Sequence, residues 1–366
     1  MKLSTHVALL LLSLWCLPAV SLQADEPQSL GTPPSTEGQA QLLGLPDSEG
    51  PLSVTATFQV MDINEVNDEE ETFEFSGILR LTWLDERLAF DPATEGVSEK
   101  IYQGPFQVDE VSPAWSPQVL LANSSGMFEV SAVLLRVKPD GVCTLVQSIN
   151  AVAEVNLNLR RYPFDRQRLE AIFEIFGFEA SEVMLKVDPI SMQADGREIE
   201  IPQWTLRDIQ SSTREIEAPY LGGPSTSSAF VLAIDIERQS FFMLRLVVIP
   251  LVLIVLLSFS VFWMDRSTLG DRMSVSFVGI LTAVAYQIVV GDIFPQISYL
   301  TLMNSFLSMS FLVLCATVVV NLVVGSWDKS GQVERGHWLD LRCRQLFPIV
   351  YFGLLGLSTA IMYLFF

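Results

Sequence analysis

Basic residues and histidine are scarce in this chain of 366 residues. Lysine and arginine number 22 against 42 aspartates and glutamates, which gives a net charge of −20. A protein that binds nucleic acid needs a basic surface, so this balance argues against nucleic acid as a partner. The two histidines are His6 and His337, so the long stretch between them has no histidine to bind a metal or to titrate near neutral pH.

Cysteine is also rare. Cys143 is the only cysteine of the acidic region 25–238, so no disulfide can form within that region. The sequence also shows no nucleophile–base pair, no glycine-rich phosphate loop and no metal-ligand spacing. We therefore predict neither an enzyme nor a protein that needs a cofactor or a metal.

Charge is unevenly divided along the chain. Residues 25–238 carry 36 acidic and 14 basic residues, whereas residues 239–366 carry 6 acidic and 7 basic residues. An acidic half followed by a nearly neutral, apolar half indicates a water-facing domain joined to a membrane domain. We place the water-facing domain at 52–238 and the membrane domain at 239–366.

The N-terminus has the pattern of a secretory signal. Lys2 supplies the positive start, residues 7–20 the apolar run and Ala24 a small residue suited to cleavage, which predicts a signal peptide at 1–24. An uncleaved anchor is the alternative, although the apolar run is short for a membrane span. The acidic stretch 25–51 is rich in proline, glycine and serine and is expected to be a disordered leader.

Four further apolar segments are long enough to cross a lipid bilayer. We expect helices at about 240–264, 272–292, 298–325 and 342–366. A cleaved signal places the acidic domain outside, and the links then predicted to be cytoplasmic hold most of the basic residues near the spans, as the positive-inside rule requires. The sequence thus predicts a multi-pass protein of the cell membrane with its N-terminal domain outside.

Between Leu52 and Glu237, apolar and polar residues alternate in short runs, and turn residues separate one run from the next. The predicted strands are 52–63, 72–83, 127–137, 151–159, 169–178 and 229–237. Many short strands without a helical period favour an antiparallel β-sandwich of the immunoglobulin type. The predicted fold class is therefore β plus α: an extracellular antiparallel β-sandwich followed by a four-helix transmembrane bundle.

Six short sequence features resemble the pentameric ligand-gated ion channels, the Cys-loop receptor superfamily, and they occur along the chain in the order found in that family. RYPFDRQRL resembles the loop that joins the sandwich to the membrane domain, and the other strings are WLDERLAFD from Trp83, WSPQVLLAN from Trp115, the arginine Arg238 before the first span, FPQISYLT from Phe294 and RCRQLFP from Arg342. Val155 and Leu169 stand where animal members have the paired cysteines. The chain therefore resembles the disulfide-free bacterial branch and is similar to its amine-gated members. The resemblance implies a homopentamer in the bacterial inner membrane.

One face of the second span carries a regular pattern. Residues spaced four and three apart share this face: Ser274, Val278, Leu281, Ala285, Ile288 and Asp292. A packed helix seam shows the same spacing, but the resemblance implies a pore, with Asp271 at its inner mouth. Five copies would place carboxylate rings that attract monovalent cations at both mouths, with a closed apolar gate between Leu281 and Ile288. Two alternatives stay open: Arg272 could neutralise Asp271, or both could only anchor the membrane end.

The resemblance also implies an agonist site between subunits, where an ammonium group meets aromatic rings. Its candidates are Phe176, Phe178 and Tyr220, although both phenylalanines could instead pack in the core. Because this box has fewer aromatics than the family pattern, a small primary amine is the expected agonist. Protons acting on carboxylates of raised pKa are a second candidate, and the acidic run NDEEETFE could bind modulatory Ca²⁺.

The expected coupling residues lie where the two domains meet: Tyr162, Pro163, Phe164, Asp165, Arg238, Phe294 and Pro295. A buried Arg238 needs a carboxylate partner, for which Asp165 and the residues Glu69–Glu71 are the candidates. A membrane-anchored sensor that does not conduct is the main alternative to a channel. A secondary transporter would favour charge near the middle of its spans, which these spans lack.

Overall fold

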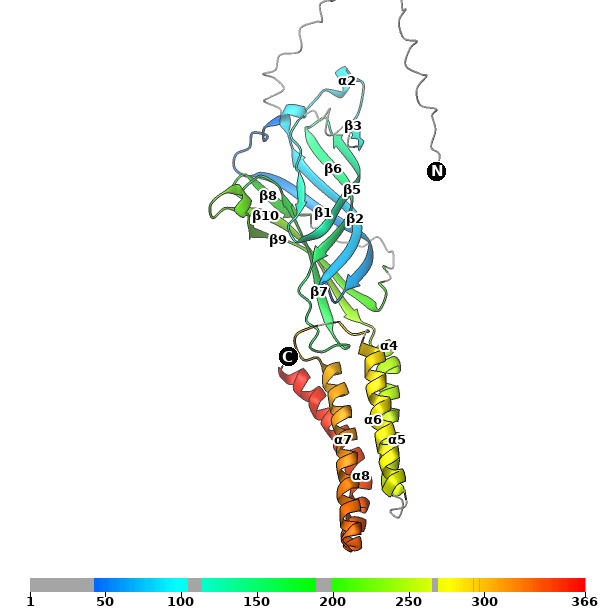
Figure 1. Cartoon of the computed structure of the whole chain (residues 1–366). Coiled ribbons are helices and arrows are strands. Elements are labelled where there is room, and N and C mark those ends of the chain that lie inside the picture. The colour runs from blue at the N-terminus through cyan, green and yellow to red at the C-terminus, as the bar shows by residue number, and fades with distance from the viewer. Residues whose placement is uncertain are drawn as a thin grey trace, which may run out of the picture.

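The computed structural model describes residues 43–104, 114–188, 199, 201–264, 269–291, 293–295 and 297–365. A β-sandwich stands on a bundle of long helices, and the C-terminus returns to the sandwich end of the bundle (Figure 1). The predicted signal peptide 1–24 and the predicted leader as far as residue 42 lie outside the described residues.

Two sheets form the sandwich. The larger has the order β3-β5-β6-β2-β1-β8 and the smaller β4-β7-β10-β9. The strands of the larger sheet are β1 (Leu52–Asn67), β2 (Thr72–Leu84), β3 (Lys100–Gln103), β5 (Ser124–Val137), β6 (Val142–Glu154) and β8 (Val183–Val187). Those of the smaller sheet are β4 (Val119–Leu121), β7 (Arg166–Ile175), β9 (Trp204–Glu217) and β10 (Thr226–Arg238).

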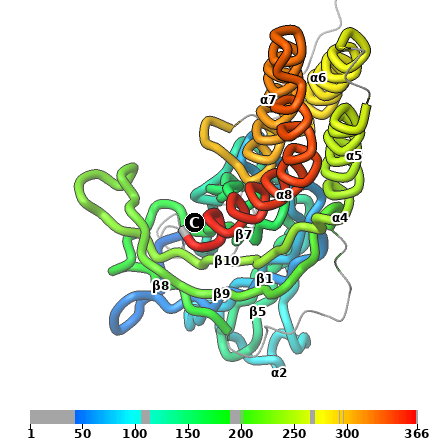
Figure 2. Tube along the Cα trace, turned by 90° about the horizontal axis from the view of Figure 1, so that it is seen from below, coloured from blue at the N-terminus to red at the C-terminus, as the bar shows by residue number. Residues whose placement is uncertain are grey.

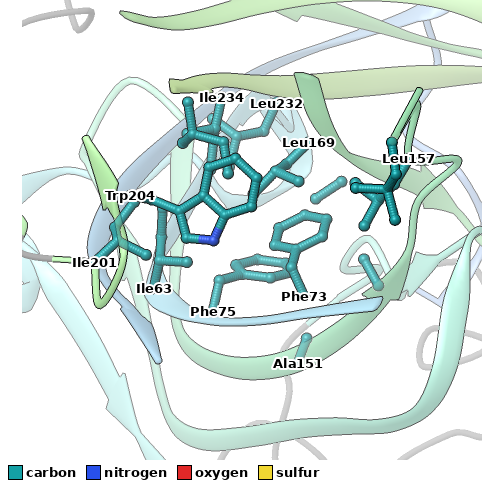
Figure 3. Close-up of a cluster of buried hydrophobic side chains, with 14 of the residues drawn as sticks. Ile63, Phe73, Phe75, Ala151, Leu157, Leu169, Ile201, Trp204, Leu232 and Ile234 are labelled. Atoms are coloured by element: carbon teal, nitrogen blue, oxygen red, sulfur yellow. The ribbon is translucent and has the colours of Figure 1, made fainter. Parts of the chain in front are cut away.

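The core lies between these sheets. Alternation along each strand sends one set of side chains inward, so Phe73 and Phe75 of β2 face Trp204 of β9 and Leu232 of β10 (Figure 3). Full burial of such a side chain contributes about 1.5–3 kcal/mol through the hydrophobic effect. The predicted sandwich is confirmed.

The sheets differ from the prediction in several details: β3, β4, β8 and β9 were not among the predicted strands, and β7 ends at Ile175. The pair β1–β8 is parallel, with Leu52 opposite Val183, whereas the sheet was expected to be antiparallel throughout. The strand expected at 151–159 is the end of β6, which begins nine residues earlier at Val142 and stops at Glu154. Residues 155–159 instead lead into the loop that faces the membrane domain.

Four helices are long and apolar enough to cross a membrane within the part of the chain that the structure describes. The first runs over Phe241–Trp263 and combines α4 (Phe241–Met243), the π-turn η3 (Leu244–Val248), α5 (Ile249–Phe259) and the 3₁₀ turn η4 (Ser260–Trp263). The others are α6 (Leu269–Gly291), α7 (Leu302–Lys329) and α8 (Val333–Phe365). Seen from below, α8 lies beside α7 (Figure 2). The chain is thus a multi-pass membrane protein.

Two helix starts differ from the expected ones. The third helix begins at Leu302, where the Thr301 side chain accepts a hydrogen bond from the Asn304 N–H and caps the helix. The fourth begins at Val333 rather than near residue 342, so the link from Lys329 is short. This earlier start places Asp340 on a helix that packs within the bundle.

The π-turn in the first span has a local cause. Pro250 has no N–H, so the carbonyl of Leu246 loses its usual partner within the helix. The Tyr286 hydroxyl of α6 donates to the Leu246 carbonyl and lies 3.3 Å from that of Val247. These contacts join the irregular part of the first span to α6.

Candidate functional site

The predicted pore face of α6 is open in the single chain. All of its described members are exposed: Asp271, Ser274, Val278, Leu281, Ala285 and Ile288. Leu281 keeps 69% of its surface accessible. Asp292, the expected outer carboxylate, lies outside the described residues. The exposed face is therefore free to meet water or another subunit.

The opposite face of α6 packs against the neighbouring helices. Its buried residues are Arg272, Ser276, Ala283 and Val290. The Asn321 amide of α7 donates to the Ser276 hydroxyl at 2.8 Å. A Cβ added at Gly279 would overlap the side chain of Ser258 on α5, so that glycine permits close approach of the two helices. These contacts fix the rotation of α6 and hence the direction of its exposed face.

Hydroxyl groups on the exposed side are bonded within their own helix. Ser274 Oγ donates to the Gly270 carbonyl at 2.9 Å, and Thr282 Oγ1 donates to the Val278 carbonyl at 2.8 Å. Because the proton of each hydroxyl is engaged in this way, the exposed oxygen can still act as an acceptor. Such oxygens suit a partly dehydrated cation.

Arg272 does not turn toward the exposed face. Its side chain is buried and pairs with Asp340 of α8, with an Nη2–Oδ1 distance of 2.8 Å. The sequence had suggested that Arg272 could neutralise Asp271. The structure instead separates the two charges, with Asp271 exposed and Arg272 directed into the bundle.

Two of the three predicted agonist residues lie together. The rings of Phe176 and Tyr220 are stacked, with centroids 5.0 Å apart and planes 20° apart, and both rings are about half exposed. Tyr220 lies on the 3₁₀ turn η2 (Pro219–Leu221) between β9 and β10. Phe178 is partly buried instead: it packs edge-on against Trp115 and against the core. The core alternative therefore holds for Phe178.

A carboxylate accompanies this aromatic pair. Tyr220 donates through its hydroxyl to Glu174 Oε2 at 3.1 Å, and Glu174 is buried at 3% exposure. Burial, together with the charge and hydrogen bond of Glu174, raises the pKa of Tyr220. Glu174 was not predicted from the sequence. The available signal was its position two residues before Phe176 in the predicted strand 169–178, because residues two apart along a strand share one face.

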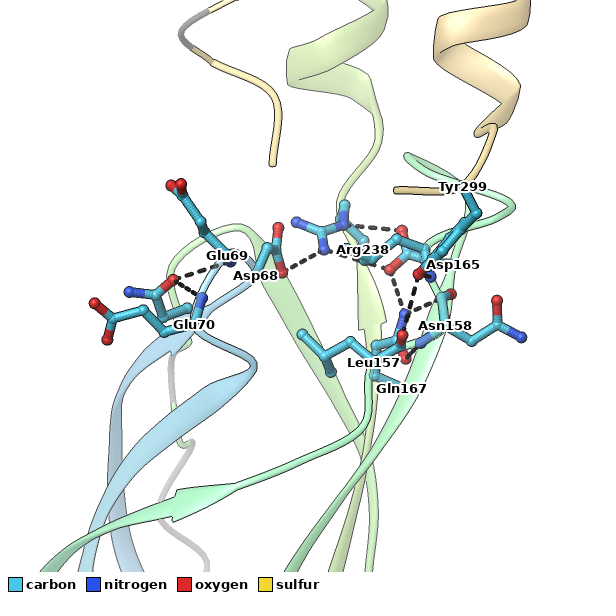
Figure 4. A network of polar contacts seen from close by, with 11 residues as sticks. Asp68, Glu69, Glu70, Leu157, Asn158, Asp165, Gln167, Arg238 and Tyr299 are labelled. Carbon is cyan, nitrogen blue, oxygen red and sulfur yellow. Dashed lines mark hydrogen bonds and ion pairs between the residues drawn. The ribbon is translucent and has the colours of Figure 1, made fainter. Parts of the chain in front are cut away.

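At the junction of the two domains, Arg238 is held by two carboxylates (Figure 4). Its Nε donates to Asp165 Oδ1 at 2.9 Å, and its Nη2 donates to Asp68 Oδ1 at 2.8 Å. The guanidinium also lies over the rings of Trp204, at 4.0 Å, and Tyr162, at 4.7 Å. The predicted partner Asp165 is confirmed, whereas the second partner is Asp68 and not one of Glu69–Glu71.

Burial and charge act in opposite directions on these groups. Burial lowers the pKa of Arg238, but the hydrogen bonds and charges of Asp68 and Asp165 outweigh it and raise that pKa. For Tyr162, burial raises the pKa to about 12, although the nearby guanidinium opposes the shift. The junction is thus a buried, charged cluster at the base of the sandwich.

The loop between β6 and β7 rests on the link between α6 and α7. Tyr162 meets Phe294 edge-on at 6.2 Å, and the Arg160 carbonyl accepts from the Leu302 N–H at 2.9 Å. Tyr299 donates its hydroxyl to the Leu157 carbonyl at 3.2 Å. The loop is thus in direct contact with the link between α6 and α7 and with the first residue of α7.

The remaining predicted coupling residues lie near this contact. Pro163 is buried, whereas Phe164 is exposed on the same loop. In the link, the Pro295 carbonyl accepts from the Ile297 N–H at 3.0 Å. These three residues lie in the segments that meet at the junction.

The acidic run at the β1–β2 turn is organised by Asn67. Its Oδ1 accepts from the N–H groups of Glu69 and Glu70, both at 3.0 Å. Within the described residues, no group of three or more histidine, cysteine or acidic side chains is placed to hold a metal ion. Modulation by Ca²⁺ stays a prediction from the sequence.

Comparison with known proteins gives matches to both domains. Residues 42–240 match the model of the neurotransmitter-gated ion-channel ligand-binding domain, and residues 247–351 match that of the neurotransmitter-gated ion-channel transmembrane region. A proton-gated ion channel from Gloeobacter violaceus is 26% identical over 307 residues, which cover 84% of this chain and 82% of that protein.

Animal proteins match as well. The human gamma-aminobutyric acid receptor subunit rho-1 is 25% identical over 281 residues, 75% of this chain and 57% of that subunit. The human rho-3 subunit is 24% identical over 304 residues, 79% of this chain and 63% of that subunit. The chain thus spans less than two thirds of the length of these receptor subunits.

Proposed function

The chain belongs to the neurotransmitter-gated ion channels, the pentameric Cys-loop family, and on that premise we propose that it forms a homopentameric, cation-selective channel opened by a small extracellular amine. The observation that carries the proposal is the exposed face of α6, which combines Asp271, a hydroxyl and apolar side chains. Five copies around an axis turn each of these residues into a ring.

Cation selectivity follows from the charge at the inner mouth. Asp271 is exposed in the first turn of α6, and Arg272 is engaged elsewhere with Asp340. A ring of carboxylates attracts cations and repels anions. Ser274, one turn further along the same face, supplies the oxygen ligands that a cation needs as it sheds water.

The gate is apolar. Between Ser274 and the outer end, the exposed face carries Val278, Leu281, Ala285 and Ile288. A narrow ring of such side chains stops ions by excluding water, without closing the path sterically. Leu281 lies near the middle of this stretch and is the gate residue in this proposal.

The agonist site is built on Glu174, Phe176 and Tyr220. An ammonium group over an aromatic face gains about 0.5–2 kcal/mol, and a buried carboxylate adds a charge-assisted hydrogen bond. Tyr220 covers Glu174 and lies on a turn between strands, so its displacement would expose the carboxylate to an amine. The relatives named for gamma-aminobutyric acid support an amine ligand.

Current recordings with short primary alkylamines and γ-aminobutyric acid test this site, with alcohols of equal length as uncharged probes. We expect the amines, but not the alcohols, to open the channel. Glu174→Gln should raise the amine concentration for half-maximal current by roughly tenfold or more. Glu129→Gln, which removes an exposed carboxylate from β5, is the matched control. Equal responses of the two variants would refute the proposed amine site.

Proton gating is the second candidate, because a proton-gated channel from Gloeobacter violaceus is 26% identical to this chain. In that case acidification without any amine opens the channel, and the half-activating pH is unchanged by Phe176→Leu. A current that requires the amine at constant pH would favour the amine-gated channel over the proton-gated one.

A further inference from the structure

Arg272 and Asp340 form a buried ion pair between the pore-facing helix and the fourth helix. Arg272 Nη1 donates to Asp340 Oδ2 at 3.1 Å and Nη2 donates to Oδ1 at 2.8 Å, a two-pronged contact. The side chains are 1% and 4% exposed. The residues are 68 positions apart in the sequence, so the pair exists only because the helices pack together.

Two further contacts hold the same region. Arg344 of α8 donates through Nε to the Phe262 carbonyl at 2.8 Å, at the end of the first span. Leu269, the first residue of α6, packs against Gly325 of α7 so closely that a Cβ there would lie 2.7 Å from its side chain. Helix α8 thus contacts the end of the first span through Arg344 and the start of α6 through Asp340, while α7 packs against the first residue of α6.

The pair is not explained by stability alone. A buried ion pair is often no more stabilising than apolar side chains of similar volume. Here Arg272 Nε is also buried and finds no hydrogen-bond acceptor among the described residues. The position of the pair, directly beside the exposed Asp271, suggests a role in the charge of the inner mouth.

We propose that Asp340 is a positioning residue for ion selectivity: it holds Arg272 away from the pore and cancels its charge, so that Asp271 alone sets the field at the inner mouth. This inference rests on the proposed cation channel. Successive residues point about 100° apart around a helix, which lets Asp271 face the axis while Arg272 points into the bundle.

The guanidinium of Arg272 is a permanent positive charge. Arginine cannot lose its proton in a protein, so Arg272 stays charged whether or not Asp340 is present. The field of a close ion pair falls off faster with distance than that of a single charge. Without Asp340, five uncompensated cations would lie next to five Asp271 carboxylates and oppose them.

The test is the sodium-to-chloride permeability ratio of the full-length channel, measured from reversal potentials in salt gradients. Asp340→Asn is expected to lower the ratio by roughly tenfold, because it leaves Arg272 charged and unpaired. The double variant Arg272→Gln/Asp340→Asn is expected to return it to within about twofold of the original. Glu334→Gln, which removes an exposed carboxylate from the first turn of α8, is the matched control and should leave the ratio unchanged.

The exchange Arg272→Asp/Asp340→Arg gives an independent readout if Asp340→Asn fails to fold. It keeps the pair but reverses its polarity, so the proposal requires an unchanged ratio. A large change in either direction would mean that ions sense residue 272 despite its pairing, which would overturn the proposal. A conducting Asp340→Asn channel with its original ratio would do the same. Failure of the proposed function is distinct, because the unmodified protein would then be silent or anion-selective.

Discussion

Replacement of Arg238 by glutamine should destabilise the extracellular domain and uncouple it from the helices. The guanidinium has two carboxylate partners and lies over the rings of Trp204 and Tyr162. Glutamine is too short and carries no charge to replace these contacts. Asp165, whose side chain is 1% exposed, would then be a buried carboxylate without its counter-ion.

The magnitude follows from this burial. Removal of one partner from a buried ion pair costs about 3–5 kcal/mol. For a domain of this size, each kcal/mol corresponds to roughly 2–4 °C in the melting temperature. We therefore expect a decrease of roughly 6–20 °C for Arg238→Gln. The double variant Asp165→Asn/Arg238→Gln removes both buried charges and should recover more than half of the loss.

Arg207→Gln is the matched control. Arg207 pairs with Glu237 at 2.7 Å, a distance similar to those of Arg238, but its side chain is 57% exposed. An exposed pair is screened by water and contributes little to stability. Thermal unfolding of the purified protein, followed by tryptophan fluorescence, measures both variants. Equal shifts would refute the reasoning from burial. In parallel, Arg238→Gln should bind amine at the cell surface but give no current.

Two further predictions concern packing and pH. Gly279→Ala should destabilise the helix bundle by about 1–3 kcal/mol, because its methyl group would overlap Ser258, whereas Gly353→Ala, which meets no atom within 4 Å, should be neutral or slightly stabilising; thermal unfolding compares them. The pKa of Tyr162 is raised from 10.0 to about 12, so the stability that depends on its protonated form is complete below pH 10 and is lost between pH 10 and 12. Between pH 10 and 12, Tyr162→Phe should lose up to about 2.7 kcal/mol less stability than the original protein. Chemical denaturation of both proteins at pH 10 and at pH 12 measures this difference, and an equal loss of stability in the two proteins would contradict it.

The architecture could be predicted from the sequence because it depends on local patterns. Alternation over 52–63 marks β1, and uncharged runs mark the spans. Even the exposed face of α6 follows from spacing, since helix geometry fixes which residues lie together. Features that depend on how one segment turns relative to another were harder to predict.

Three residues illustrate this limit. Asn67 accepts hydrogen bonds from the N–H groups of Glu69 and Glu70 and so fixes the turn between β1 and β2. In this turn it is Asp68 that contacts Arg238. Phe178 is not part of the Phe176–Tyr220 pair because Gly177, with φ of 89°, changes the direction of the chain after β7. Asp340 was expected before the fourth helix and not within it, so its contact with Arg272 could not be foreseen.

The central claim is tested most directly by voltage-clamp recording from liposomes that contain the purified protein, in a sodium chloride gradient with amine applied outside. We predict a current that requires the amine, reverses near the sodium equilibrium potential and disappears when sodium is replaced by a large impermeant cation. Leu281→Ser, which puts a hydroxyl on the apolar gate, should open at lower amine concentration. Reversal at the chloride potential would contradict cation selectivity, and silence of both the original protein and Leu281→Ser would contradict the channel itself.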